Sequence, residues 1–115
     1  MYILVNEDIK INKGKLAGQV GHAVLTYAYI HLMQIIKNHI TYSIFDKYMG
    51  EQKKIILFCS QSKLEELESY GHVAIRDKGH TDLPPNTLTC VNIGIIDSNN
   101  IPEELMFIKD LKLVR

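Results

Sequence analysis

This 115-residue chain lacks an excess of charge of either sign, because 13 lysines and arginines balance 13 aspartates and glutamates. A strongly basic composition is typical of proteins that bind nucleic acid over much of their surface. Since that signal is missing here, any contact with RNA must come from a local basic patch.

Long apolar runs and a cysteine framework are missing as well. The apolar opening Met1 to Val5 is too short for a signal peptide, and no run approaches the length of a membrane span. The only cysteines, Cys59 and Cys90, lie inside apolar segments, which predicts buried thiols in a reducing compartment. We therefore expect one domain over residues 1–115, working in the cytoplasm without a membrane partner.

What the sequence does contain is an alternation of apolar runs and helical patterns. Continuous apolar runs predict strands buried on both faces, and apolar residues at helical spacing predict helices. The expected strands are Tyr2–Val5, Lys54–Cys59, His72–Ile75 and Leu88–Ile96, with Leu111–Val114 as a strand or packed tail. The expected helices run from Gly14 or Lys15 to Asn38, from Tyr42 to Met49 with Gly50 as the stop, over Lys63–Glu68 after a Ser60 or Ser62 cap, and from Ile101 to Leu105.

This order of elements predicts an α/β fold. No helical pattern separates the third and fourth strands, so we expect them to form an antiparallel pair instead of a βαβ unit. The prediction is a three-layer α/β/α sandwich around a mixed sheet.

The longest predicted helix carries a polar stripe. At about 100° per residue, Lys15, Gln19, His22 and Thr26 fall within roughly 60° of one another, opposite the apolar face. A helix needs only the apolar stripe to dock on a core, so the polar one is either an ordinary solvated face or a functional surface. Gly14 permits close backbone approach, and the free amides at the start of the helix favour an anion.

Asp77 is the natural partner of Lys15, provided that its loop folds over the same end of the sheet. Thr81 would add a hydroxyl group to the same pocket. The alternative is that Arg76, Asp77 and Lys78 form a solvated loop whose charges pair locally. A metal site can also be drawn from three histidines and one aspartate, namely His22, His72 and His80 with Asp77 or Asp82. These residues include no pair of ligands at metal-binding spacing, so we expect neither metal nor cofactor.

Two segments of the chain carry a resemblance to a known family. The first is Asp8–Ala23 (DIKINKGKLAGQVGHA), and the second is Ile75–Thr81 (IRDKGHT). They resemble the signature motifs of type II peptidyl-tRNA hydrolases, which read Asp-Leu-Lys-Met, Gly-Lys-(Ile/Leu)-Ala-Ala-Gln and His-Ala in the first and Ile-Arg-Asp-Ala-Gly-Arg/Lys-Thr in the second. The order of elements agrees as far as Ile101–Leu105 and Leu111–Leu113, so the similarity covers nearly the whole chain.

The resemblance implies a mixed four-stranded sheet and hydrolysis of the ester that links a peptide to the 3′ end of tRNA. It associates five matching positions with the active site, namely Lys15, Gln19, His22, Asp77 and Thr81. The candidate substrate contacts around them are Lys10, Lys13, Gly14, Arg76, Lys78 and His80. The expected partner is peptidyl-tRNA, in translation and ribosome rescue. A homodimer is an open alternative to a monomer, since no apolar stripe in the sequence identifies an interface.

The chain departs from the family pattern at charged positions. Asn6 stands where the family usually has arginine, His80 where it has arginine or lysine, and Asp82 where it commonly has glutamine or glutamate. Each change makes the expected tRNA-binding face less basic, and phosphate binding depends on lysine and arginine. The segment between the Leu64 helix and Val73 is also several residues shorter than usual.

Ester hydrolysis needs an activated water and a stabilised oxyanion. We predict that Lys15, held by Asp77, polarises the ester carbonyl or holds the terminal phosphate, with Gln19 and Thr81 orienting the water. Either His22 or Asp77, acting through a water, is the general base. No serine or cysteine lies next to a base, so direct attack by water is favoured over a covalent intermediate. The alternatives are a hydrolase of another ester or amide, and a non-catalytic module that binds tRNA or protein.

Overall fold

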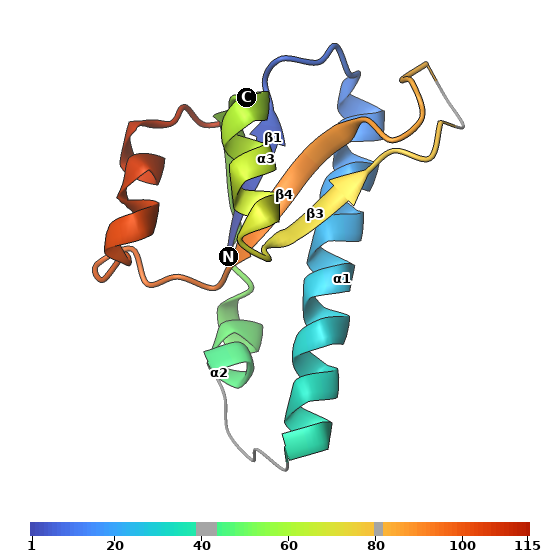
Figure 1. Ribbon diagram of the computed structural model, residues 1–115. Coiled ribbons are helices and arrows are strands. Elements are labelled where there is room, and N and C mark those ends of the chain that lie inside the picture. Colours follow the sequence, from blue (N-terminus) through green and yellow to red (C-terminus); the bar gives the residue numbers. More distant parts are fainter. Residues whose placement is uncertain (39–43, 80–81) are drawn as a thin grey trace.

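The structure is a computed structural model that describes residues 1–38, 44–79 and 82–115. Its elements follow one another as β1 (Tyr2–Asn6), α1 (Lys13–Asn38), α2 (Ile44–Glu51), β2 (Ile55–Cys59), α3 (Gln61–Ser69), β3 (Val73–Arg76), β4 (Leu88–Gly94) and the 3₁₀ helix η1 (Glu103–Asp110) (Figure 1).

The strands form one sheet in the order β2-β1-β4-β3. The central strand β1 pairs in parallel with β2 and antiparallel with β4, and β3 pairs antiparallel with β4. The prediction of an α/β fold with a mixed sheet, including the antiparallel third and fourth strands, is confirmed.

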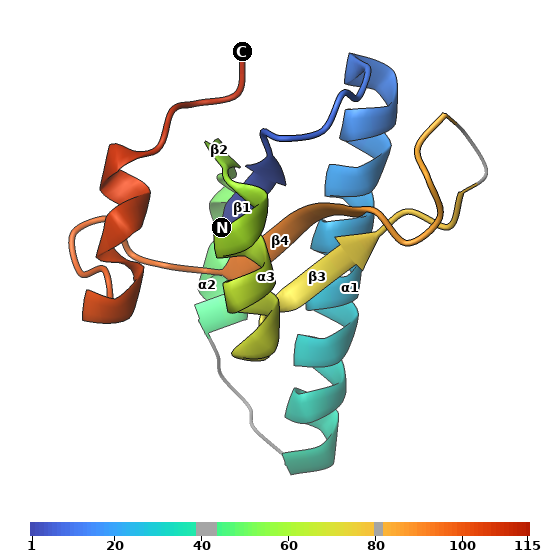
Figure 2. The same ribbon diagram turned by 45° about the horizontal axis from the view of Figure 1, so that its top comes forward.

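The side chains of β1 alternate between two apolar clusters. Ile3 and Val5 pack with Ala23 of α1. Tyr2 and Leu4 pack in the second cluster, which holds Leu64 and Leu67 of α3 and Leu105 and Ile108 of η1. Because successive side chains of a strand point to opposite faces, α1 covers one face of β1 while α3 and η1 cover the other (Figure 2).

Several element boundaries differ from the sequence-based prediction. The helix α1 begins at Lys13, because the side-chain oxygen of Asn12 caps it by accepting a hydrogen bond from the amide of Lys15 (2.8 Å). The helix α2 passes through Gly50 and ends at Glu51, before Gln52 turns to a φ of 52°. The strand β4 ends at Gly94 instead of Ile96, because Gly94 has a φ of 97°. The expected start of the second helix, Tyr42, lies outside the described residues.

The C-terminal tail returns to the sheet edge. Leu113 forms an isolated antiparallel bridge with Leu57, and the amide of Val114 donates to the carbonyl of Ile56 (3.0 Å). The chain after η1 therefore ends as a packed tail against β2, one of the two outcomes expected for Leu111–Val114.

The two thiols are free and buried, as predicted. Burial raises the pKa of Cys59 and of Cys90 to about 11, so neither is a thiolate at neutral pH. Within the ranges that the structure describes, no helix is both long enough and apolar enough to cross a membrane.

Candidate functional site

The two family-like segments meet in a buried ion pair. Lys15 Nζ, on the first turn of α1, lies 2.9 Å from Asp77 Oδ1, on the residue that follows β3. The two side chains are only 12% and 6% exposed. The ion pair expected from the sequence is therefore present, and the alternative that Asp77 belongs to a solvated loop is wrong. Because both side chains are largely buried, the charge of Lys15 acts more strongly on a neighbouring group than a charge at the surface does.

The turn after β3 holds the Asp77 carboxylate in place. Its second oxygen, Oδ2, accepts a hydrogen bond from the amide of Gly79 (2.9 Å). The backbone of Asp77 is also tied to the start of β4, because its amide donates to the carbonyl of Thr87 (2.8 Å). Gly79 has a φ of 82°, and a Cβ there would lie 2.6 Å from Pro85 Cγ. Only glycine fits this turn without a shift of the backbone, so the position of the carboxylate depends on Gly79.

One turn further along α1, the buried amide of Gln19 meets a strand residue that the sequence analysis missed. The hydroxyl of Thr89 lies 2.9 Å from Gln19 Oε1 and 3.0 Å from the carbonyl oxygen of Ile75. Thr89 sits in β4 where the register with β3 shifts, since Ile75 pairs with Cys90 and Arg76 with Leu88. This bonding fixes the Gln19 side chain and ties α1 to both strands.

A hollow of about 680 Å³ opens beside the ion pair. Its α1 wall consists of Lys15, Gly18, Gln19, His22 and Thr26, and its second wall is formed by residues 74–78. The polar stripe predicted for the helix therefore lines a cavity, with His22 exposed on the wall one turn beyond Gln19. We refer to this cavity as the Lys15 hollow.

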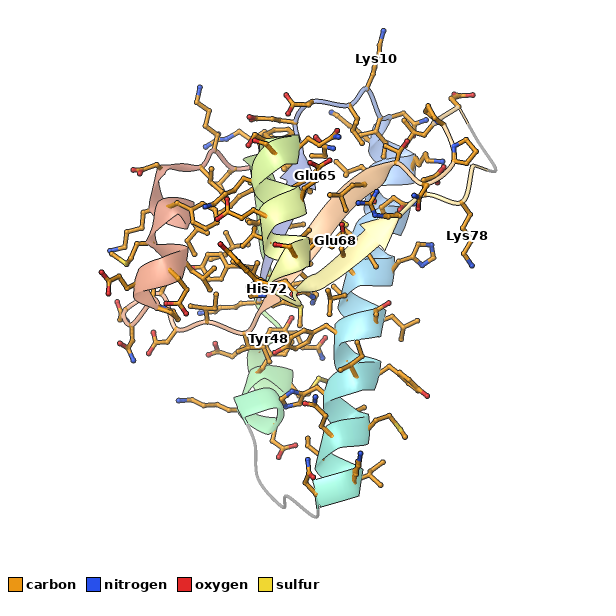
Figure 3. The ribbon with its side chains drawn as sticks, viewed as in Figure 1. Lys10, Tyr48, Glu65, Glu68, His72 and Lys78 are labelled. Carbon is orange, nitrogen blue, oxygen red and sulfur yellow. The ribbon has the colours of Figure 1, made fainter. Side chains whose placement is uncertain are left out.

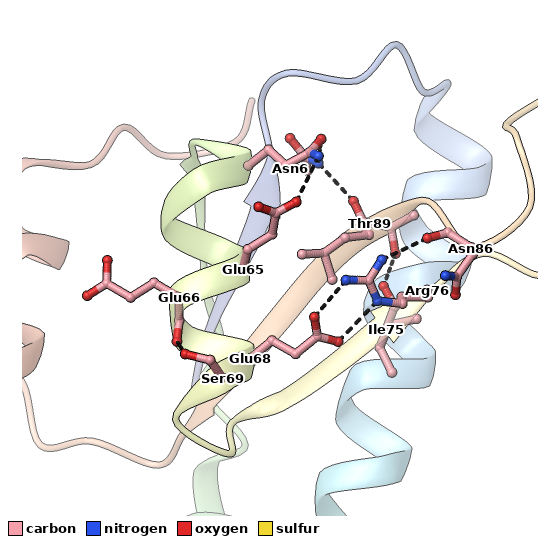
Figure 4. A network of polar contacts seen from close by, with 11 residues as sticks. Asn6, Glu65, Glu66, Glu68, Ser69, Ile75, Arg76, Asn86 and Thr89 are labelled. Atoms are coloured by element: carbon pink, nitrogen blue, oxygen red, sulfur yellow. Dashed lines mark hydrogen bonds and ion pairs between the residues drawn. The ribbon is translucent and has the colours of Figure 1, made fainter.

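Arg76 also lines this hollow, but its guanidinium group binds elsewhere. Nε and Nη2 form a bidentate pair with Glu68 of α3 (3.1 and 2.6 Å), and Nη1 donates to the carbonyl of Asn86 (2.8 Å) (Figure 4). The bond to Glu68 raises the pKa of Arg76, and the bond to Arg76 lowers the pKa of Glu68. All three nitrogens of Arg76 therefore already donate within the protein.

The other candidate cations are exposed side chains. Lys13 and Gly14 lie on the exposed first turn of α1, and Lys10 precedes them in the loop. Lys10 and Lys78 extend away from the body of the molecule (Figure 3). Lys10 also lines a second hollow, of about 450 Å³, together with Arg76 and Asp82.

Two of the predicted site residues, Thr81 and His80, lie outside the described residues. A metal-binding cluster of three or more His, Cys, Asp or Glu side chains is not found within residues 1–38, 44–79 and 82–115.

Asn6 is 1% exposed, its Nδ2 donates to the carbonyl of Leu88 (2.8 Å), and its Oδ1 accepts from the amide of Asp8 (2.9 Å). This buried side chain ties the loop before α1 to β4.

Two supporting residues besides Thr89 were not identified from the sequence. Asn12 could have been found as a helix-capping residue, because asparagine before a helical pattern is a signal for the start of a helix. Gly79 could have been found as a turn residue two positions after Asp77. Thr89 had a weaker signal, since a threonine in a β-branched run is ordinary strand composition.

Comparison with known proteins gives consistent similarities. The family model of peptidyl-tRNA hydrolase PTH2 matches residues 1–114. The peptidyl-tRNA hydrolase of Haloquadratum walsbyi is 37% identical over 106 residues, covering 86% of this chain and 88% of its own. That of Staphylothermus marinus is 37% identical over 121 aligned positions, covering 97% and 92%. That of Methanococcus vannielii is 35% identical over the same length, covering 97% and 96%.

Proposed function

The chain belongs to the peptidyl-tRNA hydrolase PTH2 family, and on this premise we propose that it hydrolyses the ester bond between peptide and tRNA in peptidyl-tRNA. The observation that carries the proposal is the buried pair of Lys15 and Asp77 beside a hollow of about 680 Å³. A fixed and largely buried ammonium is suited to stabilising the oxyanion that forms when water attacks an ester.

In this mechanism Lys15 polarises the ester carbonyl, and Asp77 is the positioning residue that holds the ammonium. The backbone amide of Gly79 and the ammonium already occupy the two oxygens of Asp77. A carboxylate that accepts charge-assisted bonds on both oxygens is a poor proton acceptor. This argument favours His22 over Asp77 as the general base, because His22 is exposed on the wall of the same hollow and its imidazole can reach a water there.

The amide of Gln19, fixed by Thr89, is placed to orient the attacking water. Thr81, outside the described residues, stays a candidate for the same task. The water attacks the carbonyl carbon and passes a proton to His22. As the bond to the ribose oxygen of tRNA breaks, His22 gives that proton to the leaving oxygen, so that the products are the free peptide carboxyl group and the tRNA hydroxyl group. This route needs no covalent intermediate and no metal.

We assign the tRNA end of the substrate to the exposed lysines around the ion pair. Lys10, Lys13 and Lys78 offer three ammonium groups, and the amides at the start of α1 favour a phosphate. With three contacts to single-stranded RNA, the slope of log affinity against log salt should be roughly −2. A slope near zero would instead favour a hydrolase of a small ester.

The first experiment measures release of labelled peptide from peptidyl-tRNA at low salt by the wild type and by Lys15→Met. We expect the variant to lose about 10²- to 10³-fold in kcat, the usual effect of removing one oxyanion donor. Near-native activity in the variant would overturn the assignment of Lys15. No activity in either protein, with the fold intact by circular dichroism, would favour the non-catalytic binding module.

A second variant, His22→Asn, tests the choice of base. The pH profile of kcat/KM reports the titration of the essential base in the free enzyme. We expect His22→Asn to lower kcat/KM and to remove the acidic limb of that profile. An unchanged profile would return the role to Asp77.

Three broader features belong to the same proposal. The packing of α1 on one face of β1 and of α3 with η1 on the other supports a three-layer α/β/α sandwich forming a single domain over residues 1–115. Buried free thiols suit a reducing cytoplasm, where translation supplies the substrate. A homodimer follows from the family resemblance alone, and sedimentation equilibrium would test it.

A further inference from the structure

The strand β3 has a free edge beside the Lys15 hollow. Within the described residues, β3 is the last strand of the sheet and pairs only with β4. The carbonyl of Ile75 faces β4, because it lies 3.0 Å from Thr89 Oγ1, and the amide of Asp77 donates to Thr87 on the same side. Because backbone groups alternate along a strand, Ala74 and Arg76 direct their N–H and C=O groups away from β4.

The space along this edge extends well beyond the ion pair. A third hollow, of about 250 Å³, is lined by Tyr27, Ile30, His31 and Gln34 of α1, by residues 71–73 at the start of β3, and by Asn92 and Ile93 of β4. Along α1 its lining starts at Tyr27, the residue after Thr26 of the Lys15 hollow, and along β3 it ends at Val73, the residue before Ala74. The two hollows therefore follow the same pair of elements from Asp77 to His72, and together we call them the α1–β3 groove.

We infer that the α1–β3 groove binds the peptide part of peptidyl-tRNA as an added β-strand on the free edge of β3. This inference rests on the proposed function, because it places the ester at Lys15. An extended chain added to a sheet edge is held by main-chain hydrogen bonds, with adjacent pockets receiving alternate side chains. The backbone of Ala74 and Arg76 supplies such donors and acceptors, and Gly18, His22 and Thr26 of α1 form the floor of the groove.

The position of the ester sets the direction of the bound peptide. The esterified end is the C-terminus of the peptide, and it must reach Lys15, beside the C-terminal end of β3. The peptide then runs in the same direction as β3, so the pairing is parallel. At about 3.3 Å per residue, the four residues of β3 can pair with about four residues of peptide.

This mode of binding suits a hydrolase that must accept many peptide sequences. The bonds from Ala74 and Arg76 reach only the backbone of the peptide, which is the same for every sequence. The groove wall is mixed in character, with exposed His22 and Ile30 and half-buried Thr26, and among the described residues it would not demand one particular side chain. Selectivity should therefore depend on peptide length and backbone more than on sequence.

The test compares N-acetylated peptides of one, four and eight residues on the same tRNA. We expect kcat/KM to rise at least tenfold from one to four residues and to change little from four to eight. In the four-residue substrate, N-methylation at alternate residues should lower kcat/KM about five- to tenfold, because only every second peptide N–H faces β3. Equal rates at all lengths, or equal effects of every N-methyl group, would overturn the inference while leaving the proposed function intact. No hydrolysis of any substrate would overturn both.

A matched pair of variants tests the same groove from the side of the protein. Thr26→Tyr places a large ring on the floor of the groove, whereas Leu25→Tyr places it on the adjacent position of α1, which is 69% exposed and lines a different hollow. We expect Thr26→Tyr to lower the ratio of kcat/KM for the four-residue and one-residue substrates about tenfold. Leu25→Tyr should leave that ratio unchanged. An unchanged ratio in Thr26→Tyr, with the fold intact by circular dichroism, would contradict peptide binding in the groove.

Discussion

Two adjacent residues at the end of β3 form ion pairs that point in opposite directions. Arg76 reaches α3 and pairs with Glu68 at 2.6 Å, whereas Asp77 reaches α1 and pairs with Lys15 at 2.9 Å. The first pair is 34% exposed on both sides, and the second is 12% and 6% exposed. Sequence order places these charges side by side, but the alternation of the strand assigns them to different faces of the sheet.

The difference in burial indicates that the two ion pairs have different roles. Water and salt screen a pair that is one-third exposed, so that it mainly fixes geometry and contributes little free energy. The Arg76–Glu68 pair joins α3 to β3, and its arginine also binds the carbonyl of Asn86 after the turn (Figure 4). The Lys15–Asp77 pair lies beside an open hollow, where an unscreened ammonium can act on a substrate.

Matched amide substitutions should separate the two pairs most clearly. We expect Asp77→Asn to lower kcat about 10²-fold, because the ammonium of Lys15 loses the charge that holds it in place. Removing one partner of a buried pair also costs roughly 3 kcal/mol in the free energy of unfolding. Urea denaturation and peptide release at low temperature measure both effects.

The control for this experiment is Glu68→Gln, which makes the same chemical change in the Arg76–Glu68 pair. Its activity should stay within about twofold of the wild type and its free energy of unfolding within about 1 kcal/mol. If Glu68→Gln lost as much activity as Asp77→Asn, the division of tasks between the two pairs would be wrong.

A smaller effect is expected from the turn that fixes Asp77. In Gly79→Ala, the added Cβ would lie 2.6 Å from Pro85 Cγ at a φ of 82°, so the backbone must shift. We expect the amide bond to Asp77 Oδ2 to weaken, kcat to fall about tenfold and the free energy of unfolding to fall by about 1–2 kcal/mol. Glycine at position 71 gives a matched control, because it also has a positive φ but no atom within 4 Å of the place that a Cβ would occupy. Gly71→Ala should lose stability without losing kcat.

The sequence predicts much of this site because its residues share simple periodicities. Lys15, Gln19 and His22 fall on one helix face at a spacing of about 3.6, and that face lines the hollow. The same reasoning could not find Thr89, because its contact with Gln19 depends on a register shift between β3 and β4 that no local pattern reports. The sequence named Asp77 as the partner of Lys15 and Arg76 as a substrate contact. It could not show that Arg76 binds Glu68, because only the packing of α3 on the opposite face brings Glu68 within reach.

The smallest expected effect is the pH dependence of the Arg76–Glu68 pair. Arg76 lowers the pKa of Glu68 below its ordinary value of 4.5. A carboxyl group whose pKa is lowered on folding stabilises the folded state above its unfolded pKa, and this contribution disappears as the pH falls through the folded pKa. The difference in unfolding free energy between the wild type and Glu68→Gln should therefore be below about 1 kcal/mol at pH 7, since the pair is one-third exposed. It should shrink below pH 4.5 towards zero, because a protonated carboxyl group and an amide are then equally neutral. A difference that stayed constant in urea titrations from pH 7 to pH 3 would show that Glu68 acts through its shape and hydrogen bonds and not through its charge.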